Sequence, residues 1–191
     1  MSRYDDDIWR LVPTEPGPPP PHLVRFVHDL GGSAPALDLG CGDGRLSAEL
    51  RTEELVAADV SQVALERARA RLPSARTVLV APDGPLPFED GSFELVLCAE
   101  TIEHVRDVQL LLSEARRVLR PGGRLAVTTP AHGRTTALDL LVRGFERRFD
   151  PLSPHIRFLT ARSLAALLHT LGFEPGPVRR EAGSLLAVAR R

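Results

Sequence analysis

The stretch that decides the fold is Ala36-Leu-Asp-Leu-Gly-Cys-Gly-Asp-Gly-Arg-Leu46. It opens with apolar residues around a single acid, which is the pattern of a buried parallel strand. Three glycines alternating with Cys41 and Asp43 then predict a tight turn whose backbone approaches a ligand closely. Arg45 to Arg51 is predicted to be a helix, so the stretch is interpreted as strand, turn and helix.

Two acids beside this turn indicate the kind of ligand. Asp38 stands two residues before Gly40, so the motif is Asp-x-Gly-x-Gly-x-Gly. A second apolar run, Leu55 to Ala58, ends in Asp59, an acid suited to accept hydrogen bonds from both hydroxyls of a ribose. A glycine-rich turn alone is weak because surface loops are also rich in glycine. Together, the turn and the acids favour a nucleoside-containing cofactor, and the spacing argues against a nicotinamide-binding dehydrogenase.

Composition limits the class of protein. The chain has 191 residues, of which 43% are hydrophobic, so we expect one domain with a substantial core. Its net charge of −1 provides no overall field that would recruit nucleic acid. There is no apolar run long enough to span a membrane, and the acidic, proline-rich N-terminus does not resemble a secretory signal. Cys41 and Cys98 are interpreted as reduced residues of a cytoplasmic protein.

Strands and helices are predicted to alternate along the chain. This alternation predicts an α/β fold, in which a parallel sheet is joined by right-handed crossovers and ligands bind at the carboxyl ends of the strands. Further strands are expected at Arg76 to Ala81, Ser92 to Cys98 and Arg124 to Thr129. Helices are expected at Leu23 to Leu30, Ser61 to Leu72, Val105 to Leu119 and Ser163 to Leu171.

Two segments are less regular than the rest. Residues 1–21 are predicted to be irregular, either as a disordered tail or as a flap that lays Tyr4 and Trp9 over the cofactor cleft. Residues 22–191 are expected to form a single domain. Within it, residues 132–154 interrupt the alternation on the ligand side, and are interpreted as an insertion that covers the substrate or as a plain connecting helix.

These motifs together resemble those of the class I S-adenosylmethionine (SAM) dependent methyltransferases, in the type 11/12 group. The residues that carry the resemblance are Leu37 to Gly44, Ala58 to Ser61, Pro87 to Val96, Glu100 to Val105 and Arg117 to Gly123. The resemblance implies a Rossmann-like sandwich, with a seven-stranded, mostly parallel sheet, an antiparallel last strand and helices on both faces. It also implies SAM as the methyl donor.

The resemblance assigns donor-binding roles by position. The amino-acid end of SAM is expected at the glycine-rich turn, the ribose at Asp59 and the adenine at the loop after the third strand. That loop departs from the family, because Pro82 stands where an acid is often found and Asp83 lies one residue later. The residues expected to bind SAM are Asp38, Gly40, Cys41, Gly42, Gly44, Asp59, Val60, Asp83 and Cys98.

The acceptor side has a cluster of ionisable residues. Glu100, Glu103 and His104 share one side of a helical turn if a helix begins there, and His155 follows much later. His104, Glu100 and His132 are the catalytic candidates, with a histidine acting as general base. A second interpretation places Mg²⁺ or Mn²⁺ on Glu100, Glu103, His104 and His155. That arrangement resembles the ubiquinone-pathway O-methyltransferases and the small-RNA 3′-end 2′-O-methyltransferases.

The favoured function is methyl transfer to an oxygen, or a nitrogen, of a small-molecule acceptor. Arginines in and after the insertion add the option that this acceptor is anionic. One alternative is a metal-dependent RNA 3′-end 2′-O-methyltransferase, although the near-neutral charge makes RNA the less favoured partner. Another is a SAM-binding module without catalysis.

Overall fold

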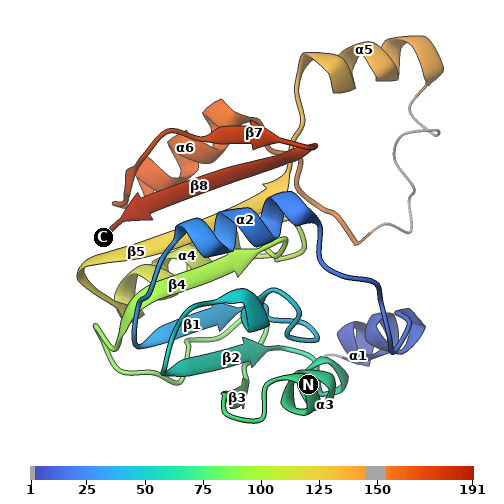
Figure 1. The fold of residues 1–191 in the computed structure, drawn as a ribbon. Helices are drawn as coiled ribbons and strands as arrows, with labels where there is room; N and C mark the ends of the chain where they lie inside the picture. Colours follow the sequence, from blue (N-terminus) through green and yellow to red (C-terminus); the bar gives the residue numbers. More distant parts are fainter. Residues whose placement is uncertain (1–2, 145–153) are drawn as a thin grey trace.

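One sheet forms the centre of the protein, seen in Figure 1. The structure, a computed structural model, describes residues 3–144 and 154–191. This described part has eight strand segments. Seven of them follow the order β3-β2-β1-β4-β5-β8-β6, and the eighth, β7, pairs with β8. The central strand is β1 (Ala36–Leu39), which pairs in parallel with β2 (Leu55–Asp59) and β4 (Phe93–Ala99). The α/β class is confirmed.

The order of the strands decides where a ligand can bind. From β1 the chain proceeds to β2 and then to β3 (Arg76–Leu79) on one side. It then crosses to β4 and β5 (Leu119–Pro130) on the other side, so the direction of winding reverses between β1 and β4. Parallel strands separate at such a point and leave a crevice at their carboxyl ends. The loops after β1, β2, β4 and β5 therefore surround one site.

The far edge of the sheet is antiparallel, as the resemblance implies. β8 (Ser184–Arg190) pairs antiparallel with β5. β6 (Glu174–Pro175) and β7 (Arg179–Glu181) pair with successive parts of β8, so together they occupy a single strand position. The sheet therefore has seven strand positions, as predicted.

Helices cover both faces because side chains alternate along the buried strands. In β4, Leu95 and Leu97 pack in one cluster with α2 (Pro21–Asp29), whereas Val96 packs in the cluster on the opposite face. The helices α4 (Val108–Val118) and α6 (Ala161–Thr170) cover this opposite face. The helix α3 (Gln62–Arg71) packs separately, against β2. Among the described residues, no helix combines the length and the apolar character needed to cross a membrane.

The helix predicted at Arg45 to Arg51 is wrong. Only a single 3-10 turn, η1 (Ser47–Glu49), forms there. The backbone becomes extended at Leu50, whose side chain is buried in the cluster that α2 shares, so packing and not helix propensity decides the conformation here. The helix expected from Val105 begins instead at Val108, because the Asp107 side chain accepts a hydrogen bond from the backbone N–H of Leu110.

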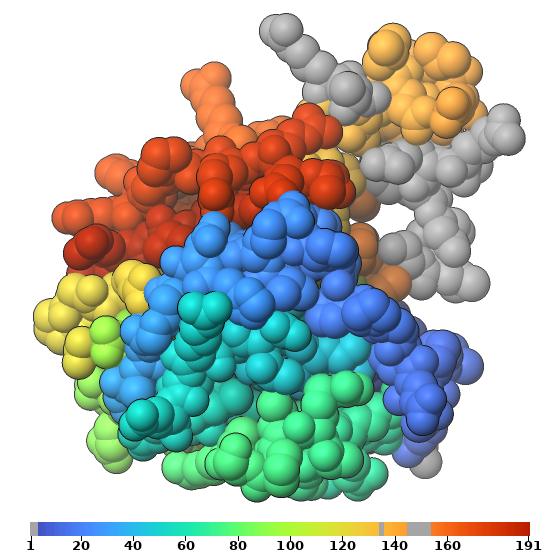
Figure 2. Space-filling view, viewed as in Figure 1, coloured from blue at the N-terminus to red at the C-terminus, as the bar shows by residue number. Residues whose placement is uncertain are grey.

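Two helices lie beyond the carboxyl ends of the parallel strands in Figure 1. The first, α1 (Arg3–Leu11), falls in a segment predicted to be irregular, and it packs against α3. Figure 2 shows the dark blue N-terminal segment against the green surface of α3. The second, α5 (Arg134–Arg143), lies within the predicted insertion. Residues 145–153 of that insertion, which include Arg147 and Arg148, two of the arginines considered for an anionic acceptor, lie outside the described residues.

Candidate active site

The glycine-rich turn follows β1 directly and has the backbone that its sequence predicts. Gly40, Gly42 and Gly44 all have positive φ, at 82°, 54° and 79°. A Cβ on Gly40 would lie 2.4 Å from the Cγ2 of Thr101, and one on Gly42 would lie 2.6 Å from the Cζ2 of Trp9. Side chains are therefore excluded here by backbone conformation and by space. Thr101 comes from the loop after β4, so the two halves of the site touch at Gly40.

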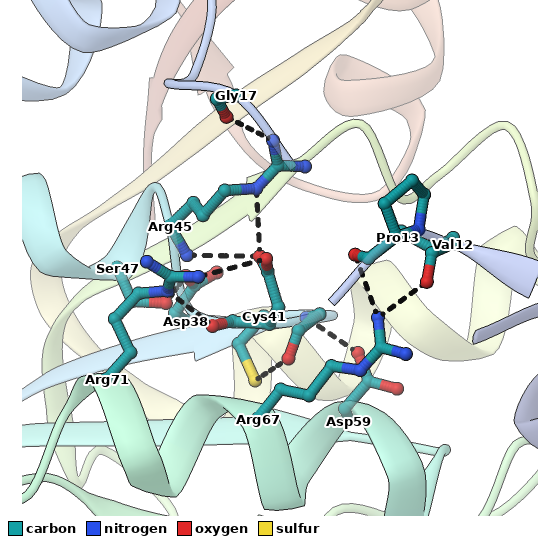
Figure 3. A network of polar contacts seen from close by, with 12 residues as sticks. Val12, Pro13, Gly17, Asp38, Cys41, Arg45, Ser47, Asp59, Arg67 and Arg71 are labelled. Atoms are coloured by element: carbon teal, nitrogen blue, oxygen red, sulfur yellow. Dashed lines mark hydrogen bonds and ion pairs between the residues drawn. The ribbon is translucent and has the colours of Figure 1, made fainter. Parts of the chain in front are cut away.

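Two buried carboxylates lie beside this turn. Asp59 accepts hydrogen bonds from the backbone N–H groups of Gly42 and Ser61, both at 2.9 Å. Asp38 accepts a 2.5 Å hydrogen bond from the Ser47 hydroxyl. Burial raises the pKa of Asp59 and raises that of Asp38 to about 7. A cationic ligand would stabilise both charges, which suits a donor that carries an ammonium and a sulfonium. Figure 3 shows these acids and the polar contacts around them.

The acceptor side is built around Glu103, which is 1% exposed. Its Oε2 accepts a 3.0 Å hydrogen bond from Thr129, and its Oε1 has no hydrogen-bond partner among the described residues. Burial raises the pKa of Glu103 to about 8. The Nε2 of His104 lies 3.9 Å from that Oε1, and the ring centroids of His104 and His155 are 4.7 Å apart. Burial and the neighbouring His155 lower the pKa of His104, so its imidazole is neutral at pH 7.

An extended segment, residues 154–159, brings His155 to this place. The backbone N–H of Ile156 donates to the carbonyl of Glu103 at 2.8 Å, and the His104 Nδ1 lies 3.2 Å from the carbonyl of Pro154. Further along, Leu159 bridges to the end of β5, where its carbonyl accepts from the backbone N–H of His132 at 2.9 Å. The segment thus ties the loop after β4 to the loop after β5 and forms one wall of the site.

Glu100 does not join the other three predicted metal ligands, which corrects the predicted set of four. Its Oε1 accepts a 2.9 Å hydrogen bond from the Thr128 hydroxyl, and its backbone has a φ of 50°. Residues 100–106 form turns instead of the helix that the spacing argument assumed. Among the described residues, the cluster that could hold a metal ion is Glu103, His104 and His155, whose ligand atoms lie within 4.8 Å of one another.

The other predicted residues are spread around the same edge. Cys41 is buried in the turn, whereas Cys98 packs in the hydrophobic core near the end of β4. Val60 is partly buried against that core, and Asp83 is exposed in the loop after β3. The ring of His132 packs edge-on to Phe158, with centroids 5.1 Å apart. Tyr4, predicted to cover the cleft with Trp9, is 54% exposed.

The hydroxyl groups that donate to the carboxylates of the site were not predicted from the sequence. Ser47, Thr128 and Thr129 fix the carboxylates of Asp38, Glu100 and Glu103 respectively. The two threonines lie near the end of β5, within the strand predicted at Arg124 to Thr129, but nothing in their spacing marks their acidic partners. Asp6, which lies on the unexpected helix α1, accepts a hydrogen bond from the Ser61 hydroxyl at 2.6 Å and was also missed.

Comparison with known proteins agrees with this geometry. Residues 37–127 match the family described as "Methyltransferase domain". A "Probable S-adenosylmethionine-dependent methyltransferase" of Mycolicibacterium smegmatis is 33% identical over 78% of this chain and 55% of its own length. A demethylmenaquinone methyltransferase of Clavibacter sepedonicus is 31% identical over 87% of this chain and 64% of its own. The YcgJ protein of Bacillus subtilis has a similar fold, with a TM-score of 0.73 at 16% identity over 90% and 99% of the two chains.

The chain is shorter than these curated relatives. It spans 55% of the length of the first and 64% of the length of the second. The matched family region, residues 37–127, contains the glycine-rich turn, Asp38, Asp59, Glu103 and His104, whereas His155 lies beyond it.

Proposed function

Because the chain belongs to the class I SAM-dependent methyltransferases, in the type 11 group, we propose that it transfers the methyl group of SAM to an oxygen, or a nitrogen, of a small-molecule acceptor. One observation carries this proposal. The glycine-rich turn with its two buried acids lies at the same sheet edge as the cluster of one carboxylate and two imidazoles. The loops that carry these two groups are in contact where Thr101 packs on Gly40.

The donor half supplies binding and orientation. Asp59 is assigned to the ribose hydroxyls, because its carboxylate lies at the end of β2 and is already fixed by two backbone N–H groups. Asp38 is assigned to the ammonium of the amino-acid end, and the turn from Gly40 to Gly44 to the backbone of that end. The sulfonium is an activated leaving group, so accurate in-line positioning supplies much of the rate.

The acceptor half supplies proton transfer. Transfer to a hydroxyl oxygen forms the new C–O bond, breaks the methyl–sulfur bond and releases the hydroxyl proton. His104 is assigned as the base that takes this proton, because burial and the neighbouring His155 lower its pKa and keep the ring neutral and able to accept a proton. His132, at the end of β5, is the second candidate for this role.

A divalent cation on Glu103, His104 and His155 is a second candidate for the acceptor half. The unpartnered, buried Oε1 of Glu103 favours it, because a cation would satisfy that atom. One carboxylate and two imidazoles suit Mn²⁺ better than Mg²⁺, which prefers oxygen ligands. When bound, such an ion would lower the pKa of an acceptor hydroxyl.

The acceptor is assigned as a compact metabolite. The relatives include proteins named demethylmenaquinone methyltransferase and 27-O-demethylrifamycin SV methyltransferase, whose names refer to small molecules. Arg157, two residues after His155, would favour an anionic group, since its Nη1 is buried without a hydrogen-bond partner among the described residues. The net charge of −1 argues against a long RNA track.

Incubating the protein with methyl-labelled SAM and a panel of small hydroxylated and aminated acceptors tests the proposal. Transfer of label to a small molecule supports it. Transfer only to RNA ends would establish the RNA alternative. SAM binding without turnover on any acceptor class would favour the non-catalytic module.

Removing divalent cations separates the two acceptor mechanisms. If the cation is used, dialysis against a chelator should abolish turnover, Mn²⁺ should restore it, and His155→Ala should prevent the restoration while leaving SAM affinity unchanged. His28→Ala is the matched control, because His28 pairs with Glu49 away from the cluster. Full turnover in the chelator would rule out the metal and leave His104 as the base.

A further inference from the structure

We infer that residues 3–17 form a gate over the donor site, and that SAM enters and leaves only when this N-terminal gate opens; the inference rests on the proposed use of SAM. The gate contacts the glycine-rich turn of the donor site. Trp9 lies on Gly42, the middle glycine of the turn, so closely that a Cβ there would be 2.6 Å from its ring. The backbone against which a ligand would lie is therefore covered by an indole.

Four hydrogen bonds, made by Asp6 and Arg67, hold the gate against α3 and the residues that precede it. Asp6 is 5% exposed, and its Oδ1 accepts from the hydroxyl of Ser61 at 2.6 Å and from the backbone N–H of Val63 at 3.2 Å. Arg67, on α3, donates to the carbonyls of Val12 and Pro13 at 3.0 and 3.3 Å. Its guanidinium also lies 5.8 Å from the centroid of the Trp9 ring.

A second arginine comes from the turn itself. Arg45 donates to the carbonyl of Gly17 at 2.9 Å and to the carboxylate of Asp43 at 3.1 Å. Figure 3 shows Arg45 and Arg67 reaching toward Gly17 and toward Val12 and Pro13 from the two sides of the donor site. The residues that hold the gate thus lie on the glycine-rich turn and on the segment from Ser61 to Arg67 that follows Asp59.

The gate spans both halves of the active site. Burial is the main cause of the raised pKa of Asp59 and of the lowered pKa of His104, and the Asp5 carboxylate of α1 makes a small contribution at both, adding to the first and opposing the second. Figure 1 places α1 beyond the carboxyl ends of the parallel strands, where these two groups lie. A donor seated between them would be enclosed by α1.

The same contacts indicate that the gate opens at low cost. Among residues 4–11 of α1, the buried side chain is that of Asp6, a polar group, while Ile8 and Trp9 are half-buried. A segment with little buried apolar surface and mainly polar attachments opens locally without unfolding the domain. Opening is therefore limited by the hydrogen bonds of Asp6 and Arg67.

Stopped-flow fluorescence tests the gate directly, because Trp9 is the chain's single tryptophan. We expect the observed rate of SAM binding to level off at high SAM concentration, at the rate of opening. Asp6→Asn should raise that plateau rate about tenfold and the SAM dissociation rate about tenfold. The Kd should stay within about twofold, because the substitution weakens the closed state equally with and without bound SAM. Asp7→Asn is the matched control, because Asp7 is exposed on the same helix and, among the described residues, its carboxylate pairs with Arg10.

Arg67→Ala provides an independent test should Asp6→Asn fold poorly, and the same increase is expected. Rates that rise linearly with SAM concentration and are unchanged in both variants would overturn the gate. So would tighter binding with an unchanged dissociation rate, which would make α1 a plug that excludes the donor. Failure of the proposed use of SAM is distinguishable, because the wild-type protein would then not bind SAM at all.

Discussion

Gly40→Val is expected to abolish measurable SAM binding, a loss of at least about 100-fold. Gly40 has a φ of 82°, which costs a β-branched residue about 1–2 kcal/mol or more in backbone strain. A Cβ there would also lie 2.4 and 2.5 Å from two atoms of the Thr101 side chain. Relief of the clash would push apart the loops after β1 and β4, which form the two halves of the site.

Calorimetric titration of SAM measures this effect, and the melting temperature shows whether the domain remains folded. Gly32→Val is the control, because a Cβ on Gly32 would lie 3.7 Å from the carbonyl oxygen of Arg51, an ordinary contact, and its backbone is not left-handed. Wild-type affinity in Gly40→Val would show that SAM does not bind at this turn.

His104→Ala is expected to lower turnover by about 100-fold to 10,000-fold, the usual contribution of a general base, with SAM affinity within about twofold of wild type. In the wild-type protein, turnover should fall as the pH is lowered through the pKa of His104, because only the neutral imidazole accepts a proton. Burial and His155 lower that pKa, so the fall should occur below the ordinary histidine range near pH 6.5.

A pH-rate profile and single-turnover kinetics measure both effects. His169→Ala on α6 is the control, since that residue lies in the last turn of a helix away from the site. Turnover like that of wild type in His104→Ala would transfer the base role to His132, whose variant would then carry the loss.

The donor half could be predicted from sequence because its information is local. The glycines, Asp38 and Asp59 stand directly at strand ends, where a parallel sheet gathers its functional loops. The helix expected after the turn does not form because the backbone becomes extended at Leu50, where packing against residues of α2 overrides local helix propensity. Ser61 was expected to begin the next helix and does so, since its hydroxyl accepts from the backbone N–H of Ala64.

The N-terminal helix could not be predicted because its contacts are not local. Nine residues, three of them consecutive aspartates, form a weak helix in isolation. The structure stabilises it through Asp6 on Ser61 and Arg67 on Val12, partners more than fifty residues away. The aromatic pair Tyr4 and Trp9 suggested a flap, but the sequence did not indicate which of them lies on the turn.

The acceptor half was predicted in part. His155 does reach Glu103 and His104 from 51 positions beyond His104, but Glu100 bonds to Thr128 because residues 100–106 form turns instead of a helix. Helical spacing was the wrong rule for that loop. Adjacency along the sheet edge was the right one, since it depends on strand order and not on local conformation.

Titration of SAM into the wild-type protein and into Asp59→Ala tests the central claim most directly. We predict that the wild-type protein binds SAM and that Asp59→Ala binds it about 30-fold more weakly, a loss of about 2 kcal/mol from hydrogen bonds to a charged group. Glu53→Ala, an exposed residue at the opposite end of β2, should bind as the wild type does. The absence of SAM binding in the wild-type protein, or equal affinity in Asp59→Ala, would contradict the assignment of this sheet edge as the donor site.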